Sequence, residues 1–186
     1  MATPRARDIL KVPGRLVQDP TNLAAAYPYG GTELGLTKNR SFRLRATHKE
    51  IQAEEHGMAT VEVIRSGDSP VFACTLRAYD DDALSAIFWI TATGDPSGHQ
   101  VVKSNVTGTG RAGARLSQSS MVLLHVPLAP LRHPSMLIYA AMPAVAEEAS
   151  IPWSSKEEIG IDVVFYCRPD TSDRLYAIGR LGDLSL

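Results

Sequence analysis

Alternation of apolar and polar residues is the most regular pattern in this chain, and it predicts β-strands. Phe42, Leu44 and Ala46 alternate with polar residues over residues 42–47, which is the period of a half-buried strand. Similar apolar segments, bounded by glycine, proline, serine or aspartate, occur at residues 14–17, 121–126, 135–142, 159–167 and 175–178. We expect prolines 127, 130 and 143 to end the strands they follow.

The pattern also predicts one hairpin. Residues 59–65 (ATVEVIR) and 71–79 (VFACTLRAY) are rich in strand formers, and residues 66–70 (SGDSP) between them favour a turn. We therefore expect these two strands to pair. The preceding residues 49–56 (KEIQAEEH) fit either a β excursion or one helical turn, and we favour the β excursion.

A single helix is expected at residues 81–90, where apolar residues recur at helical spacing after Asp80, Asp81 and Asp82. Asp80 is a good N-cap, and the next two acids suit the positive end of a helix. Adjacent side chains on a helix diverge, so capping explains this cluster better than metal binding does. Residues 94–119, rich in small polar residues, predict at most two weak strands around a turn.

These elements predict an all-β protein with one short flanking helix, folded as an antiparallel β-sandwich or partly open barrel. The 186 residues suit one domain. Prolines 4, 13, 20 and 28 indicate an N-terminal arm and loops over residues 1–40, so we expect the single β-domain to span residues 41–186. Two tyrosines and three glycines make residues 27–35 a specific loop rather than a spacer.

Composition excludes several classes of protein. The formal charge of −1 lacks the basic excess of a dedicated nucleic-acid binder. No apolar run approaches the ~18 residues that span a bilayer, and no apolar segment follows the N-terminal basic residues as in a secretory signal. Cys74 and Cys167 lie in apolar stretches without neighbouring ligands, so we expect two reduced core thiols and no metal.

The sequence shows no catalytic motif. Residues 108–113 match G-x-G-x-x-G, but a polar segment precedes them, a poor helix former follows, and no acid lies about 20 residues on. The five histidines are scattered, and neither a nucleophile elbow nor a phosphate-binding loop is present. We therefore expect no enzyme and no cofactor.

The order of elements resembles that of bacteriophage tail tube proteins, the major tail protein or inner tube family. The resemblance covers residues 14–180: a strand, a Gly-Gly-Thr loop, an alternating segment with an acidic excursion (AEEHG, 53–57), a hairpin, a capped helix, and a late strand followed by RLYAIG (174–179). It is a likeness of layout, without an invariant chemical motif.

The resemblance implies a structural virion protein, assembled in the host bacterial cytoplasm, whose subunits form hexameric rings that stack into a tube. Its partners would be other copies of itself and other tail proteins, such as the terminator, the baseplate hub and, in contractile tails, the sheath. DNA would pass through the lumen at ejection without specific binding. A near-neutral charge fits this, because a basic lining would hold the duplex.

Two segments are the candidate contacts between subunits: Tyr29, Gly30, Gly31 and Thr32 in the loop, and Lys49, Ile51, Glu54, Glu55 and His56 in the excursion. We expect deletion of residues 49–56 to leave a folded domain that forms no tubes. The alternatives are another tail or neck component, such as a terminator or hub part, and a monomeric ligand-binding β-sandwich using Trp89, Trp153 and the tyrosines.

Overall fold

Nine strands and one short 3-10 helix make up the part of the chain that the structure, a computed structural model, describes: residues 14–44, 46–53, 59–77, 120–130, 133–145 and 160–186. In chain order they are β1 (Gly14–Gln18), β2 (Thr32–Arg43), β3 (Ala46–Ala53), β4 (Ala59–Asp68), β5 (Val71–Leu76), β6 (Met121–Pro127), β7 (Ser135–Val145), β8 (Ile161–Cys167), β9 (Tyr176–Gly179) and η4 (Leu181–Asp183).

Six of these strands close into a barrel. The order is β6-β1-β2-β5-β8-β7, and β7 pairs back onto β6 from His125↔Met136 to Met121↔Ala141. β9 pairs with the first residues of β7 as a seventh strand, and every pairing is antiparallel. The prediction of a nearly all-β, antiparallel domain is confirmed. Because β6 and β7 pair with each other, neither exposes the unpaired edge that it would have in an open sheet.

Alternate residues of these strands fill the barrel. On β5 and β8 the inward positions are Phe72, Cys74, Leu76 and the odd-numbered residues 161–167, all buried. Apolar side chains from β1, β2, β6 and β7 join them in one cluster. Burial of this apolar surface is the main favourable term in folding, and the period of two in the sequence produces it.

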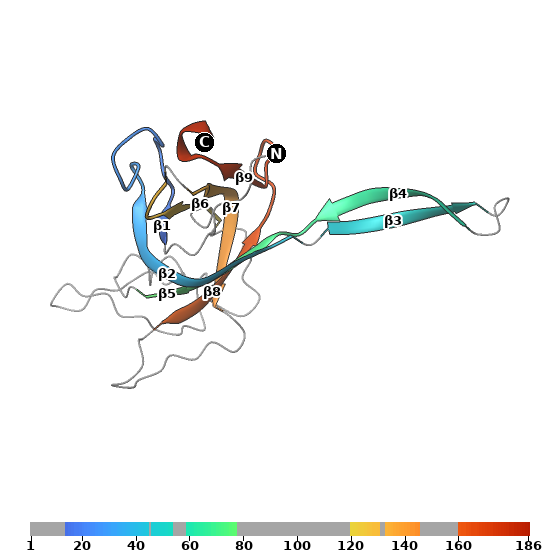
Figure 1. The fold of residues 1–186 in the computed structure, drawn as a ribbon, viewed down its shortest axis with the longest axis horizontal. Coiled ribbons are helices and arrows are strands. Elements are labelled where there is room, and N and C mark those ends of the chain that lie inside the picture. Colours follow the sequence, from blue (N-terminus) through green and yellow to red (C-terminus); the bar gives the residue numbers. More distant parts are fainter. Residues whose placement is uncertain (1–13, 45, 54–58, 78–119, 131–132, 146–159) are drawn as a thin grey trace, which may run out of the picture.

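A second core lies on the outer side of the barrel wall. Val17, Leu124, Val126 and Leu137, from β1, β6 and β7, are buried there beside Tyr29. The loop between β1 and β2 and the C-terminal segment from η4 onward cover this side (Figure 1) and pack partly buried leucines and tyrosines against it. The loop and the C-terminus thus form an outer layer over one part of the wall.

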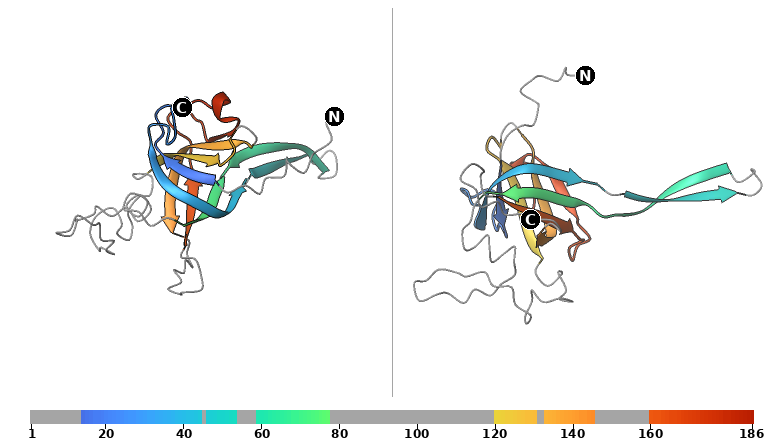
Figure 2. Two further views of the ribbon diagram at one scale, coloured as in Figure 1. Left: turned by 60° about the vertical axis from the view of Figure 1, so that its left-hand side comes forward. Right: turned by 90° about the horizontal axis from the view of Figure 1, so that it is seen from below.

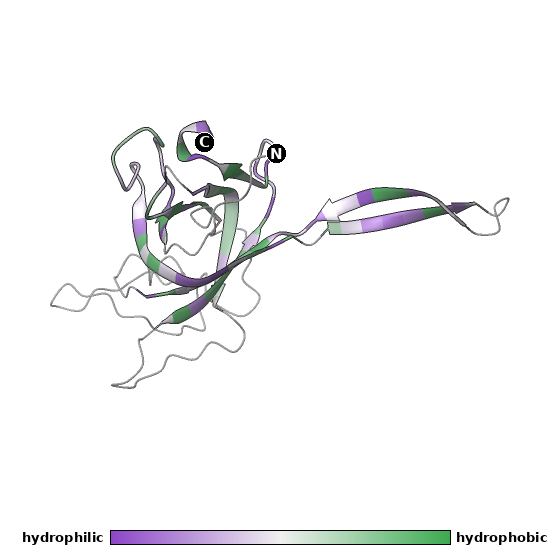
Figure 3. Cartoon of the chain, viewed as in Figure 1, coloured by the Kyte–Doolittle hydropathy of each residue, from purple (hydrophilic) through white to green (hydrophobic). Residues whose placement is uncertain are grey.

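The paired strands β3 and β4 project from the barrel as a long two-stranded ribbon, which we call the arm (Figures 1 and 2). β2 leads into β3 and β4 leads into β5, so the arm continues a pair that begins in the barrel wall. Hydrophilic stretches interrupted by hydrophobic ones run along it (Figure 3). None of the arm residues whose side chains the structure describes belongs to either core cluster.

The predicted hairpin of residues 59–65 with 71–79 is wrong. β4 pairs with β3, whereas β5, farther along the same ribbon, pairs with β2 and β8. The turn formers between β4 and β5 mark the base of the arm instead: Pro70 is buried there, and Arg65 pairs with Asp68. Glycine, serine and proline suit a kink between strands as well as a reversal.

Several smaller predictions also differ from the structure. Residues 42–47 are not one half-buried strand, because β2 ends at Arg43 and Leu44 is 59% exposed at the base of the arm. Pro143 does not end β7, which continues to Val145. Pro143 lies beyond Met121↔Ala141, the last pair between β7 and β6. At Pro143, β7 therefore pairs only with β8, and the backbone N–H that proline lacks is not needed on the side that faced β6.

The remaining predicted elements divide into two groups. The strands at residues 14–17, 121–126, 159–167 and 175–178 are confirmed within a few residues, as is the β excursion for residues 49–53. β1 and the first part of β2 belong to the barrel, although they come from the stretch in which we expected an arm and loops. The helix at 81–90, residues 94–119 and the glycine motif at 108–113 lie outside the described residues.

Candidate interaction surfaces

The arm has two faces, which cross-strand pairing defines. Lys49 lies opposite Ile64, and Ile51 lies opposite Glu62, so these four side chains share one face. On it the isoleucines form one diagonal and the charged residues form the other. Ile51 is 40% exposed and Ile64 is 45% exposed. We call this the isoleucine face of the arm.

The opposite face of the arm is more polar. His48 lies opposite Arg65, and Glu50 lies opposite Val63, which is 55% exposed. The Thr60 hydroxyl donates to the Glu50 carboxylate over 3.1 Å. Such exposed polar contacts contribute little to stability. Contacts within the arm therefore add little stability to so long a ribbon, and a contact with another molecule would account for its length.

The loop between β1 and β2 packs inward. Tyr29 is only 8% exposed and meets Tyr27 edge to face, with ring centroids 5.7 Å apart. The Arg15 guanidinium lies over the Tyr27 ring, 5.0 Å from its centroid, and is 3.7 Å from the Glu33 carboxylate. Burial, followed by the neighbouring Glu33, raises the pKa of Tyr27 above its ordinary value. The tyrosines thus anchor the loop.

Two glycines in this loop have structural reasons to be glycine. Gly30 has φ of +73°, in the left-handed region that favours glycine. A Cβ on Gly31 would lie 2.3 Å from the Gln18 carbonyl oxygen. Close packing of the loop on the end of β1 therefore requires the Gly-Gly pair, whatever else it contacts.

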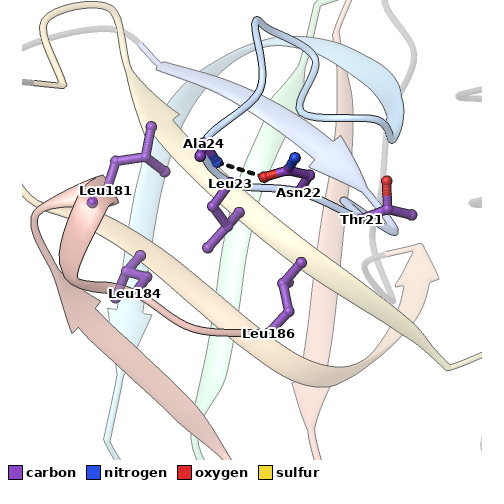
Figure 4. A pocket seen from close by; sticks show the side chains of 8 residues that line it. Thr21, Asn22, Leu23, Ala24, Leu181, Leu184 and Leu186 are labelled. Carbon is purple, nitrogen blue, oxygen red and sulfur yellow. Dashed lines mark hydrogen bonds between the residues drawn. The ribbon is translucent and has the colours of Figure 1, made fainter.

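A pocket of about 310 Å³ lies between this loop and the C-terminal segment (Figure 4). Leu23 approaches Leu181, Leu184 and Leu186 across it, and the Ala24 N–H donates to the Asn22 side chain at its edge over 3.0 Å. Its lining residues are uncharged, so it offers neither a catalytic group nor a strong polar anchor. It is a shallow, leucine-lined groove between the β1–β2 loop and the C-terminal segment.

The barrel mouth near the base of the arm holds a different pocket, of about 220 Å³. Arg40 Nη1 donates to His125 Nε2 over 2.6 Å, so the histidine is neutral at that nitrogen. Burial first, and then the Arg40 charge, lowers the pKa of His125 to about 4. Phe42, Phe72 and Met136 line the rest of it. Ser41 and Ser135 also line the pocket. The buried Ser135 hydroxyl has no hydrogen-bond partner in the part of the chain that the structure describes, so it is not paired with His125 in the way an activated nucleophile is paired with its base.

The two cysteines are confirmed as buried, free thiols. Burial raises the pKa of each to about 12, so neither forms a thiolate at neutral pH. Within the described ranges, no group of three or more histidine, cysteine or acidic side chains converges on a point that would hold a metal ion. In those ranges there is also no helix of the length and hydropathy needed to cross a membrane.

The residues predicted as contacts fall into three groups. Lys49 and Ile51 lie exposed in the middle of the paired strands of the arm. Tyr29 is buried, Gly30 and Thr32 are exposed, and Gly31 is half-buried, so only part of the loop is accessible. Glu54, Glu55 and His56 lie outside the described residues. The structure adds Glu62 and Ile64, whose β4 strand had been assigned to a different hairpin.

Comparison with known proteins adds no family. No protein-family model matches the chain, and no curated protein sequence matches it.

Proposed function

We propose that this chain is a structural subunit of a bacteriophage tail tube, a non-enzymatic protein that forms stacked rings around the channel for genome delivery. The observation that carries the proposal is the arm. A two-stranded ribbon that adds nothing to either core cluster and exposes three β-branched apolar side chains is suited to contact a neighbouring subunit.

The barrel supports the proposal from a second direction. A rigid closed barrel gives each subunit a fixed body, and a single arm that leaves it in one direction gives a head-to-tail contact. Such heterologous contacts produce rings when the rotation closes and filaments when it does not. A stack of rings needs a closing contact within each ring and a second, non-closing contact between rings, and the arm is proposed to supply one of these two.

The chemistry of the described residues is consistent with a structural role. His125 is hydrogen-bonded to Arg40 and not to the Ser135 hydroxyl of the same pocket, and the cysteines are held as thiols. With a formal charge of −1, the chain also lacks the basic excess that would retain DNA. We propose a lumen lined by acidic or neutral side chains, and a map with a mainly arginine-lined channel would contradict this.

Negative-stain electron microscopy of the concentrated protein tests the proposal. We expect rings or stacked tubes. Long tubes support a tube subunit, whereas single closed rings support a terminator or another cap of the tube. A particle that stays monomeric at every concentration contradicts self-assembly, and it favours a monomeric ligand-binding barrel, for which the mouth pocket beside Arg40 is the first place to search.

A further inference from the structure

The outer wall of the barrel carries an apolar patch on the side opposite its own covering layer. Pairings of β5 with β8 and of β8 with β7 place six outward side chains in a grid across three strands. They are Val71, Ala73, Val164, Tyr166, Met142 and Ala144. We call this grid the wall patch. Tyr166 is 41% exposed and the other five are half-buried.

The wall patch is not part of the core. None of its six residues belongs to either buried cluster or packs against one among the described residues. The loop between β1 and β2 and the C-terminal segment cover β1, β6 and the first part of β7 instead. A contiguous apolar surface across three strands is typical of the centre of a protein–protein interface.

The edge of the wall patch is mostly basic. Arg43 lies opposite Val71 on the neighbouring strand β2, and Lys38 lies opposite Thr75. Arg168 follows the outward row of β8 and is exposed. The one acid in that row, Asp162, accepts a hydrogen bond from the Thr75 hydroxyl over 2.5 Å.

The arm has the opposite charge. Residues 46–68 contain five acidic and two basic residues, a formal charge of −3. Arg65 is engaged with Asp68 at the base of the arm. On the two strands, Lys49 is then the remaining basic residue against Glu50 and Glu62, and the sequence of residues 54–58 adds two more glutamates. An acidic arm and a basic rim attract each other, which favours this pairing over contact between two arms or two wall patches.

We infer that the isoleucine face of the arm docks on the wall patch of a second copy of this chain. This rests on the proposed function and names the contact through which neighbouring subunits join. Ile51 and Ile64 cover apolar residues of the grid, and Glu62 on the same face lies toward the basic rim. The arm cannot reach its own wall patch, because it continues the β2–β5 ribbon away from the barrel.

Disulfide trapping between two different variants tests the contact. We mix the Ile64→Cys and Val164→Cys variants under mild oxidation and expect a disulfide-linked heterodimer. Val63→Cys is the matched control, because residue 63 is as exposed as residue 64 but lies on the opposite face of the arm. It should give several-fold less heterodimer with Val164→Cys. The native cysteines stay buried throughout.

Three outcomes would overturn the inference. Equal trapping by Val63→Cys would mean that the arm face is not selected. Dominant Val164→Cys homodimers would mean that two wall patches pair with each other. A Val164→Cys thiol that does not react with a small thiol reagent in the monomer would mean that the chain covers its own patch.

A mixing experiment separates this contact from the proposed function. The Ile51→Lys/Ile64→Lys variant loses the docking face, and the Val164→Glu variant loses the patch, so each alone should stay monomeric with an unchanged circular dichroism spectrum. Their mixture should form heterodimers and stop, since one working contact remains per pair. Tubes formed by either variant would refute the contact while leaving the tube proposal intact. Absence of assembly by the unmodified protein would refute both.

Discussion

Phe165 and Tyr166 are neighbours on β8 whose side chains lie on opposite sides of the barrel wall. Phe165 is fully buried, whereas Tyr166 is 41% exposed. Replacing Phe165 with alanine should lower the free energy of unfolding by about 3–5 kcal/mol, because it removes a large core side chain and leaves a cavity. Chemical denaturation of the monomer measures this.

Tyr166→Ala is the matched control for that substitution. It should change the free energy of unfolding of the monomer by only about 0.5 kcal/mol, as surface substitutions usually do. Equal losses of stability for both variants would show that Phe165 and Tyr166 do not lie on opposite sides of the barrel wall.

His125 makes stability depend on pH. Its pKa is lowered from 6.5 to about 4 in the folded chain, so the unfolded chain binds more protons between these values. Stability should be complete above pH 6.5, fall by up to about 3 kcal/mol as the pH drops toward 4, and level off below it. Denaturation midpoints across this range measure the slope.

Two variants assign that slope to His125. His125→Asn cannot titrate and should reduce the slope between pH 4 and 6.5, even if its absolute stability is lower. His48→Gln, which changes an exposed histidine on the arm, should keep the original slope. If the His125 variant retains the full slope, other groups are responsible.

The buried face of a strand could be predicted from the sequence wherever its two faces differ clearly in polarity. Residues 159–167 and 121–126 predicted buried strands because apolar side chains recur at every second position or nearly continuously. The Arg40–His125 contact was not predictable, because its partners lie 85 positions apart and meet only through barrel closure. A lone histidine in an apolar segment, as in MVLLHV, was the one local sign of a buried polar group.

At the scale of elements, the arm shows the limit of pattern reading. Residues 59–65 have the composition of a strand, and the sequence after them has the composition of a turn, which made pairing with residues 71–79 the simplest interpretation. The ladder from Ala46↔Asp68 to Ala53↔Ala59 is what the chain forms instead. Nothing in local composition distinguishes a kink between consecutive strands from a reversal between paired ones.

The arm should be removable without loss of the barrel. Deletion of residues 49–56 alone would take most of β3 and leave β4 without its partner. A cleaner change replaces residues 48–66 with Asn-Gly, joining the paired residues Thr47 and Gly67 through a tight turn. Since an isolated two-stranded ribbon is marginally stable, we expect the free energy of unfolding to change by less than about 1 kcal/mol.

Circular dichroism and thermal denaturation measure that outcome. A variant that unfolds would show that the arm holds the barrel together, contrary to its absence from both core clusters. As a second control, the exposed substitution Val63→Thr, on the opposite arm face, should change neither stability nor assembly.

For the whole molecule, the all-β fold class could be predicted from the sequence, but the closure of six strands into a barrel could not. The nine strands within the described residues agree with the expected all-β class. The pairing of β6 with β7 that closes the barrel joins two strands that were both predicted, yet their register depends on the bulge near Leu123. Assembly is harder still to predict from the sequence, because it depends on how the surfaces of separate copies fit together.

Self-assembly through the arm is the property on which the proposed function depends. It can be measured by light scattering coupled to size-exclusion chromatography, run on the unmodified protein and on the variant lacking residues 48–66 over the same concentrations. We expect particles of many subunits for the unmodified protein and a monomer for the shortened one. Equal masses for the two proteins, whether both monomeric or both assembled, would contradict self-assembly through the arm.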